Sequence, residues 1–153
     1  MNYSDDTGYY KGHWVNDKME GYGIELYETG NTYKGNYKND AKHGQGVFEW
    51  VNGDIYKGNF LNDKMHGFGR IDYGKGDATS SGLSSDTPTV NAYYEGQFVN
   101  DKKHGQGKEV FSSGDVYVGE YFNGKKHGKG CFTFKNGEKY EGDFDEDRYN
   151  LNQ

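Results

Sequence analysis

Four histidines recur at one place in a repeated pattern and are the first candidates for chemistry: His43, His66, His104 and His127. Histidine is a common zinc ligand, but zinc holds its ligand atoms at only about 2.1 Å. If successive histidines occupy successive hairpins of one sheet, they lie about 10 Å apart, because neighbouring strands are about 4.8 Å apart. The spacing therefore predicts no metal site and favours a structural role, in which each imidazole bonds a nearby turn.

The remaining reactive residues form no catalytic set. Cys131 is the single cysteine, so it cannot form an intrachain disulfide, and its strand pattern predicts a reduced, half-buried thiol. The segment 143–147 starts like an EF-hand loop, but Arg148 stands where that loop requires glycine. No serine lies in a G-x-S-x-G elbow, and no Gly-x-Gly pair opens a helix that could hold a phosphate. We therefore predict no enzyme and no cofactor.

Composition limits the kinds of partner that the protein can bind and the cellular compartment in which it works. The net charge is −6, which disfavours nucleic acid because a single-strand platform needs a basic groove besides its aromatic residues. Aromatic residues make up 17% of the chain, whereas disordered proteins contain few of them. Packing of these rings allows a thin structure to fold. The N-terminus lacks a secretory signal pattern, and no apolar run approaches a membrane span. A cytoplasmic location is the expectation.

The elements that position these residues come from an internal repeat. Six times a tyrosine is followed two residues later by glycine and after two more by an aromatic residue. The anchoring tyrosines are Tyr10, Tyr33, Tyr56, Tyr94, Tyr117 and Tyr140, at intervals of 23, 23, 38, 23 and 23 residues. A fixed period of this length indicates near-identical units stacked into an array.

Each unit has the pattern of one β-hairpin. In the second unit, residues 33–37 alternate as a first strand, 39–42 carry turn residues, and 43–50 alternate again. The predicted fold class is all-β: an elongated single-layer antiparallel sheet of stacked hairpins, with about eleven strands spanning on the order of 50 Å. Strand twist should curve its aromatic face into a groove. We expect Gly35, Gly44 and Gly46, on that face, to make room for rings.

This frame resembles the MORN repeat, with Tyr-x-Gly-x-aromatic at 33–37, His-Gly-x-Gly at 43–46 and a later glycine at Gly53. The resemblance covers residues 10 to about 147, although Glu20 replaces the histidine in the first unit and the sixth unit has only a first strand. It implies a non-catalytic interaction or scaffolding module. Such modules occur in cytoskeletal and ciliary assemblies, at membrane junctions, and attached to lipid kinases and lysine methyltransferases.

The repeat frame also sets the domain organisation. An N-terminal segment 1–9 precedes an array 10–148, and a tail 149–153 follows. The repeats are 10–32, 33–55, 56–78, 94–116, 117–139 and a partial 140–148. A loop, 79–93, is inserted between the third and fourth repeats; its Ser, Thr and Gly content favours a flexible connection over an ordered functional excursion.

The candidate site is the aromatic groove. By strand parity, eight rings face the same way and leave an apolar strip larger than monomers usually expose. They are Tyr37, Trp50, Phe60, Tyr73, Phe98, Phe111, Tyr121 and Phe134. The leading hypothesis is a cytosolic scaffold or adaptor, associated with a cytoskeletal or ciliary assembly, that grips a peptide or helical segment of a partner protein here. The alternatives are peripheral binding to anionic membrane and a self-associating rod, a homodimer joined through its terminal repeats.

A second candidate is a basic rim. Its lysines fall at or beside successive turns and are Lys102, Lys103, Lys125, Lys126 and Lys129. Such a rim is usually a solvated face, but it could also guide an acidic partner or lipid headgroups. Because turn aspartates stand beside most of these lysines, we expect any membrane lipid contact to be weak and screened near physiological salt.

Overall fold

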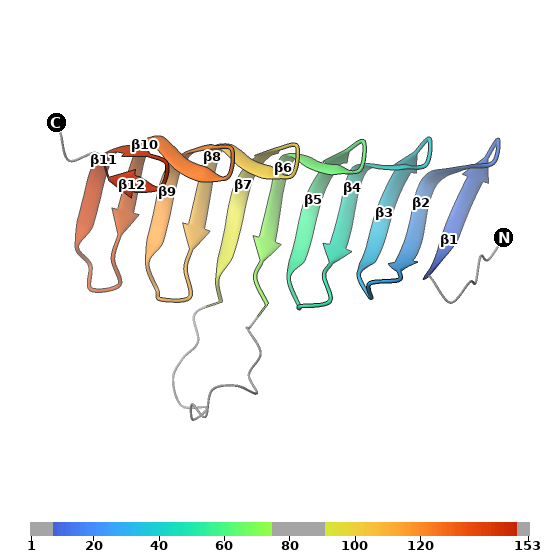
Figure 1. The fold of residues 1–153 in the computed structure, drawn as a ribbon, viewed down its shortest axis with the longest axis horizontal. Helices are drawn as coiled ribbons and strands as arrows, with labels where there is room; N and C mark the ends of the chain where they lie inside the picture. Colours follow the sequence, from blue (N-terminus) through green and yellow to red (C-terminus); the bar gives the residue numbers. More distant parts are fainter. Residues whose placement is uncertain (1–7, 75–90, 150–153) are drawn as a thin grey trace, which may run out of the picture.

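The described residues form a single open antiparallel sheet whose twelve strands follow one another in chain order (Figure 1). The structure, a computed structural model, describes residues 8–74 and 91–149, and these contain no helix. The strands are β1 (Gly8–Val15), β2 (Lys18–Tyr27), β3 (Thr32–Lys38), β4 (Ala41–Glu49), β5 (Ile55–Leu61), β6 (Lys64–Asp72), β7 (Tyr93–Val99), β8 (Lys102–Val110), β9 (Val116–Phe122), β10 (Lys125–Thr133), β11 (Lys139–Asp145) and β12 (Arg148–Tyr149). The predicted all-β architecture is confirmed.

Tight turns with positive φ close each hairpin at one side of the sheet. At Asn39 and Asp40 the φ angles are 49° and 69°, and the other repeats have the same two-residue geometry. Paired positive φ angles match the twist of the flanking strands, and asparagine and aspartate tolerate them better than most residues. From the second hairpin on, each turn also binds the hairpin before it: the Asp40 amide donates to the Met19 carbonyl at 3.1 Å, and the Met19 amide donates to Asp40 Oδ1 at 2.8 Å.

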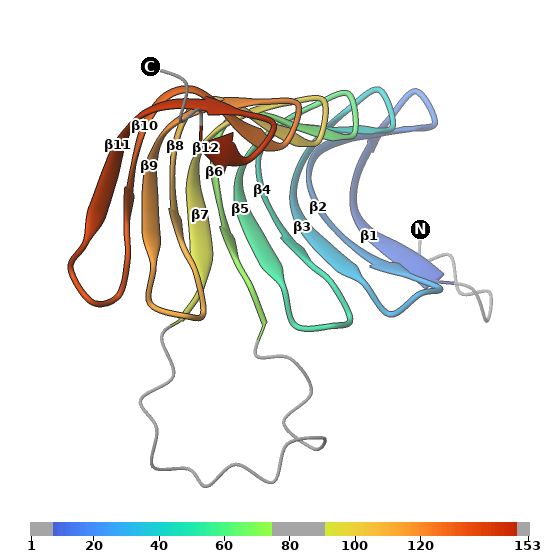
Figure 2. The ribbon, with the colours of Figure 1, turned by 60° about the vertical axis from the view of Figure 1, so that its left-hand side comes forward.

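A bulge bends every hairpin in the middle. In β3 and β4, Gly35 pairs with Gly46 and Tyr37 pairs with Lys42, so three residues of β4 face the single Asn36. Extra residues on one strand bend the pair, and Figure 2 shows all hairpins bending to the same side. Gly44, inside the bulge, has a φ of +76°, and a Cβ added to it would meet only Asn36 atoms at 3.8 Å and beyond. The prediction that Gly44 makes room for a ring is therefore wrong: it allows the bend.

The core lies inside this bend as one continuous chain of twelve aromatic rings. On a straight strand, rings four residues apart would be about 13 Å apart, since each residue advances about 3.3 Å. The bend brings the centroids of Tyr33 and Tyr37 to 5.1 Å, edge to face, and Tyr33 also contacts Phe60 of the next hairpin at 5.2 Å. The chain, which we call the ring zipper, runs Trp14, Tyr10, Tyr37, Tyr33, Phe60, Tyr56, Phe98, Tyr94, Tyr121, Tyr117, Phe144, Tyr140.

A row of glycines crosses the sheet beneath the zipper. Gly35 pairs with Gly23 on one side and Gly46 on the other, and this register continues through the remaining hairpins. A Cβ added to Gly46 would lie 2.5 Å from the Tyr33 ring, so glycine is needed for the ring to lie over the backbone. The Tyr33 hydroxyl then donates to the Asn36 carbonyl at 2.8 Å, which ties the ring to the bend. The expectation that Gly35 and Gly46 make room for rings is confirmed.

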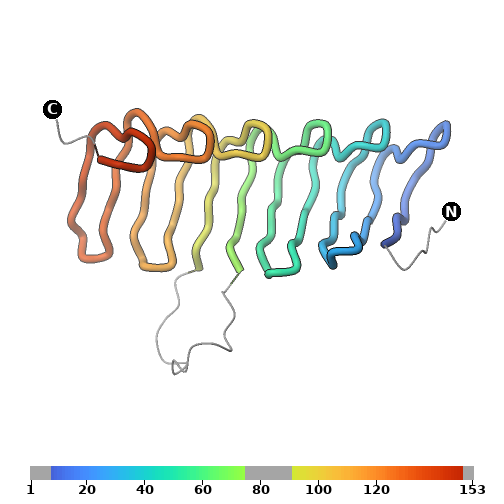
Figure 3. Tube along the Cα trace, viewed as in Figure 1, coloured from blue at the N-terminus to red at the C-terminus, as the bar shows by residue number. Residues whose placement is uncertain are grey.

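The two ends of the sheet differ. The tube in Figure 3 shows the first hairpin, in blue, and the last, in red, at opposite ends of the row. Within residues 8–74 and 91–149, β1 pairs with β2 alone, whereas β12 folds back on β11 and places Tyr149 against Phe132 and Tyr140. This short strand completes the sixth unit, for which the sequence predicted a first strand alone. Most of the predicted loop, residues 79–90, lies outside the described residues, and Tyr93 already begins β7.

Candidate protein-binding groove

The eight rings predicted to bind a partner fall into two sets. Tyr37, Phe60, Phe98 and Tyr121 belong to the ring zipper and are only 2–4% exposed. Their faces and edges are covered by neighbouring rings, so they form the floor of the concave side and contribute to folding. Substitution of any of these four rings is therefore expected to destabilise the fold, so it cannot test binding alone.

The second set is half-buried and remains within reach of a partner. Trp50, Tyr73, Phe111 and Phe134 stand just after the second strand of their hairpins and keep part of their surface free. The first three pack against the zipper, and Phe134 packs against Phe132 and Tyr149. Tyr27 occupies the same place in the first hairpin and was missed by the sequence analysis. Its signal was available, because it lies at the same position of the repeat as the other four. We call these five residues the outer rings.

Backbone hydrogen bonds hold the outer rings in equivalent positions. The Trp50 amide donates to the Asp54 carbonyl at 2.9 Å, and the Gly53 amide donates back to the Trp50 carbonyl at 3.0 Å. The same pair of bonds surrounds Tyr27, Phe111 and Phe134. A glycine with positive φ completes each of these turns, as Gly53 does at 96°. The outer rings therefore form a regular row along one side of the bend.

Two hollows lie between the outer rings and the zipper. One of about 670 Å³ is lined by Tyr10, Tyr27 and Phe48, and another of about 350 Å³ by Trp50 and Met65 among others. Lys42 borders both hollows, and turn aspartates border the second. An apolar floor with a few charged groups at its margin is the usual composition of a surface that takes up a peptide side chain.

The five lysines of the predicted basic rim lie on different faces. Lys103 and Lys126 point into the concave side, where each ammonium lies over aromatic rings, as Lys42 does in the second hairpin. Lys102 and Lys125 stay exposed beside their turns. Lys129 belongs to the other face of the sheet, where it pairs with Asp143 at 2.8 Å. Alternation along β8 and β10 separates them, since adjacent strand residues point to opposite faces.

A buried ion pair lies in the fourth repeat. The ammonium of Lys103 contacts the carboxylate of Glu109, which is 7% exposed, and the ammonium lies 5.1–5.8 Å from the centroids of the Tyr73, Tyr94 and Tyr121 rings. The Tyr121 hydroxyl donates to Glu109 Oε2 at 3.0 Å. Burial, and then the nearby Glu109 carboxylate, raise the pKa of Tyr121. Burial alone would lower the pKa of Lys103, but Glu109 and Tyr73 raise it above its usual value.

The recurring histidines lie at the bends. His104 Nδ1 accepts a bond from the Asn123 amide of the next turn at 3.4 Å, which is the predicted contact. His43 Nδ1 and His66 Nδ1 are buried without a hydrogen-bond partner in the described residues, so these two atoms do not make it. His104 and His127 also pack against the ring of Phe122. In the part of the chain that the structure describes, no three potential metal ligands converge, and no helix is long and apolar enough to cross a membrane.

Comparison with known proteins agrees with this geometry. A family model described as MORN repeat matches residues 10–32, 33–55, 56–78, 94–116 and 117–139, which are the five full hairpin repeats. The chain belongs to the MORN-repeat family. MORN repeats are generally non-enzymatic, and they indicate a protein-binding or membrane-associated repeat protein.

Other comparisons add little. A search of curated proteins found no significant match. Among solved structures, the chain matches the SAS-4 (dCPAP) TCP domain of Drosophila melanogaster, solved in complex with a proline-rich motif of Ana2 (dSTIL). The two chains share 13% identity, and the match covers 86% of this chain and 94% of the other, with a TM-score of 0.23. At that score the likeness carries no argument about function.

Proposed function

We propose that this MORN array is a non-catalytic scaffold or adaptor that binds a segment of a partner protein along the row of outer rings. The observation that supports this is the repetition of a half-buried ring at one position in five successive hairpins. Folding requires the zipper rings, which are covered, but it leaves the outer rings partly open. A row of aromatic side chains in a bend, with charged groups at its margin, suits an extended or helical segment anchored by apolar residues.

Family resemblance supports a place for such an adaptor in the cytoplasm, on a cytoskeletal or ciliary structure. The groove would hold the partner, and the length of the sheet would position it. Binding would depend mainly on apolar burial, because the concave ammonium groups of Lys103 and Lys126 are already paired with Glu109 and Asp147. We therefore expect moderate salt to weaken capture of the partner only slightly.

The test is affinity capture from cells with matched variants, read by mass spectrometry. Trp50→Ser with Tyr73→Ser removes two outer rings, whereas Tyr22→Ser with Phe68→Ser removes two aromatic residues from the opposite face. Tyr22 and Phe68 are 55% and 63% exposed, so both variants should fold. The proposal predicts that a defined set of proteins is lost with the first variant and kept with the second. Equal retention by both folded variants would refute it.

A further inference from the structure

The convex face of the sheet carries a second surface that the proposed function does not use. It is a trough of about 920 Å³ across β2–β7, on the side opposite the ring zipper. Its floor is the backbone of Gly35, Gly46, Gly58 and Gly69, at positions where a side chain would point to the opposite, zipper side. We call this surface the convex trough.

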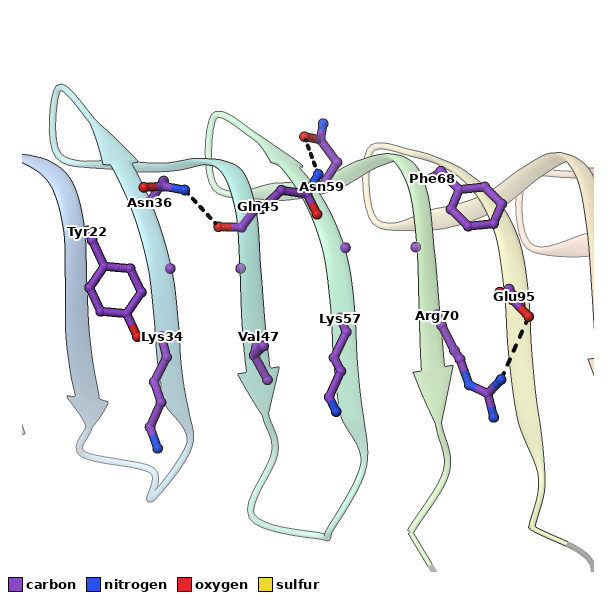
Figure 4. Close-up of a pocket in the computed structure, with 14 residues that line it drawn as sticks. Tyr22, Lys34, Asn36, Gln45, Val47, Lys57, Asn59, Phe68, Arg70 and Glu95 are labelled. Carbon is purple, nitrogen blue, oxygen red and sulfur yellow. Dashed lines mark hydrogen bonds and ion pairs between the residues drawn. The ribbon is translucent and has the colours of Figure 1, made fainter.

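One wall of the trough is a row of three cations and one valine, paired across neighbouring strands, which we call the cation row. Lys34, Val47, Lys57 and Arg70 are paired in register on β3–β6, so their side chains stand next to one another. Figure 4 shows these four side chains on the same side of the glycine row. Lys11 on β1 continues the row beyond Ile24 of β2. Within the described residues, no ion pair joins Lys34 or Lys57 to a carboxylate, whereas Arg70 is paired with Asp72 at 2.9 Å and with Glu95 at 3.7 Å.

The other wall is neutral. Asn36, Gln45 and Asn59 form a line of side-chain amides. Asn36 Nδ2 donates to the backbone carbonyl of Gln45 at 3.3 Å, and Gln45 Nε2 donates to Asn59 Oδ1 at 3.4 Å. The exposed rings of Tyr22 and Phe68 stand at the two ends of this line. The trough therefore offers positive charge along one side, and amides and aromatic rings along the other.

In the second half of the sheet the row keeps only one cation and gains two carboxylates. On β7–β11 the same register positions hold Glu95, Lys108, Val118, Cys131 and Glu141. The residues that fold the hairpins hardly change between the two halves, so folding does not require lysine at 34 and 57. Exposed, unpaired cations beside a backbone floor are complementary to an anionic ligand.

Spacing selects the ligand. Lys11, Lys34 and Lys57 stand on every second strand, about 9.6 Å apart at about 4.8 Å per strand. A polyproline II chain advances about 3.1 Å per residue with three residues per turn, so every third side chain points the same way at about 9.3 Å intervals. A chain of this kind lying across the strands would present successive carboxylates to Lys57 and Lys34 inside the trough, and a third to Lys11 on β1, just beyond its β2 end.

We propose that the convex trough binds an extended acidic peptide segment that carries a carboxylate at every third residue. From β2 to β7 the trough crosses five strand spacings, about 24 Å, which corresponds to about eight residues of polyproline II. One side of the segment faces the lysines, and a second faces the amides, Tyr22 and Phe68. The array would then bind two segments at once, one on each face of the single-layer sheet. Loss of binding at one face would leave binding at the other face unchanged.

The test is fluorescence anisotropy at low salt with two labelled nine-residue peptides of glutamate, proline and alanine. One has glutamate at positions 1, 4 and 7, and the other has the same composition with three adjacent glutamates. We expect the spaced peptide to bind at least fivefold more tightly. Lys34→Gln with Lys57→Gln should weaken its binding at least tenfold, while Lys102→Gln with Lys125→Gln, which removes the same charge beside the turns, should change it less than twofold.

Three results would overturn the proposal. Equal affinity for the two peptides would show that spacing is not recognised. Equal loss in both double variants would show that only net charge matters. Tighter binding of oligo(dT) or of phosphatidylserine vesicles, lost with Lys34→Gln and Lys57→Gln, would assign the trough to a phosphate ligand. Thermal unfolding of each variant should match the wild type, because Lys34, Lys57 and Lys102 are exposed.

Discussion

The two faces of this single-layer sheet follow different rules. On the concave face, Tyr33 is fully buried, and its counterparts in the other full repeats are also tyrosines at 0–5% exposure. On the convex face, the neighbouring Lys34 is exposed, and its counterparts include valine, glutamate and lysine. Because the sheet has no second layer, all of its apolar packing is on one side. Residues that are the same in every repeat therefore serve folding, whereas residues that differ between repeats can determine binding specificity.

The largest effect that this comparison predicts comes from neighbouring residues on one strand. Tyr33→Ala removes a zipper ring that contacts Tyr37 and Phe60 and uncovers two glycines, so we expect a loss of about 3–5 kcal/mol in the free energy of unfolding. Lys34→Ala, one residue away on the other face, should change it by less than about 0.5 kcal/mol. Urea unfolding followed by tryptophan fluorescence measures both. Similar losses for the two variants would contradict the division between faces.

A smaller but sharper effect concerns the buried ion pair. Glu109→Ala leaves the Lys103 ammonium buried among tyrosine rings without its carboxylate, which typically costs about 3 kcal/mol or more. The third repeat fills the equivalent place with uncharged residues. Met65 stands where the fourth repeat has Lys103, and Ile71 stands where it has Glu109. Phe98, from the next hairpin, takes the place of Tyr121.

The triple variant Lys103→Met, Glu109→Ile, Tyr121→Phe copies that apolar arrangement. Since well-packed apolar groups often replace a buried pair at little cost, we expect its unfolding midpoint in urea to lie near or above that of the wild type. The single Glu109→Ala variant is the control. If the triple variant were as unstable as the single one, the ion pair would be needed for the fold itself.

Much of this division could be predicted from the sequence, because the fold depends on local periodicity. The tyrosine period gave the hairpins, their order and the aromatic face, and a further regularity is visible once the contacts are known. The second ring of each repeat's Tyr-x-Gly-x-aromatic segment is a tyrosine when the preceding hairpin offers a glutamate to its hydroxyl. Tyr37 donates to Glu25 in this way, and Tyr121 donates to Glu109. Where the position of the glutamate holds Phe48, Ile71 or Phe132, the zipper residue is phenylalanine.

The depth of burial could not be predicted, for a physical reason. Strand parity places Tyr37 and Trp50 on one face but does not say that the bulge at 43–45 folds that face onto itself. The bend buries Tyr37 and leaves Trp50 half open. Parity likewise could not show that Lys103 finds a carboxylate inside the bend while Lys102 remains in solvent. Three-dimensional curvature, which comes from the positive φ of glycines such as Gly44, decides both outcomes.

The smallest predicted effect concerns Phe68, a large apolar residue on the convex face. A ring there is the strongest challenge to the statement that apolar packing is confined to the concave face. Phe68 is 63% exposed and stands opposite Gln97 on β7, so its ring removes little apolar surface from water. Phe68→Ser should therefore change the free energy of unfolding by less than about 0.5 kcal/mol, although the same change at Phe60, 3% exposed, should cost several times more. Urea midpoints of the two variants, measured side by side, decide the matter. A loss at Phe68 close to that at Phe60 would mean that the convex face also carries part of the core, and that its departures from the repeat are not free to serve binding.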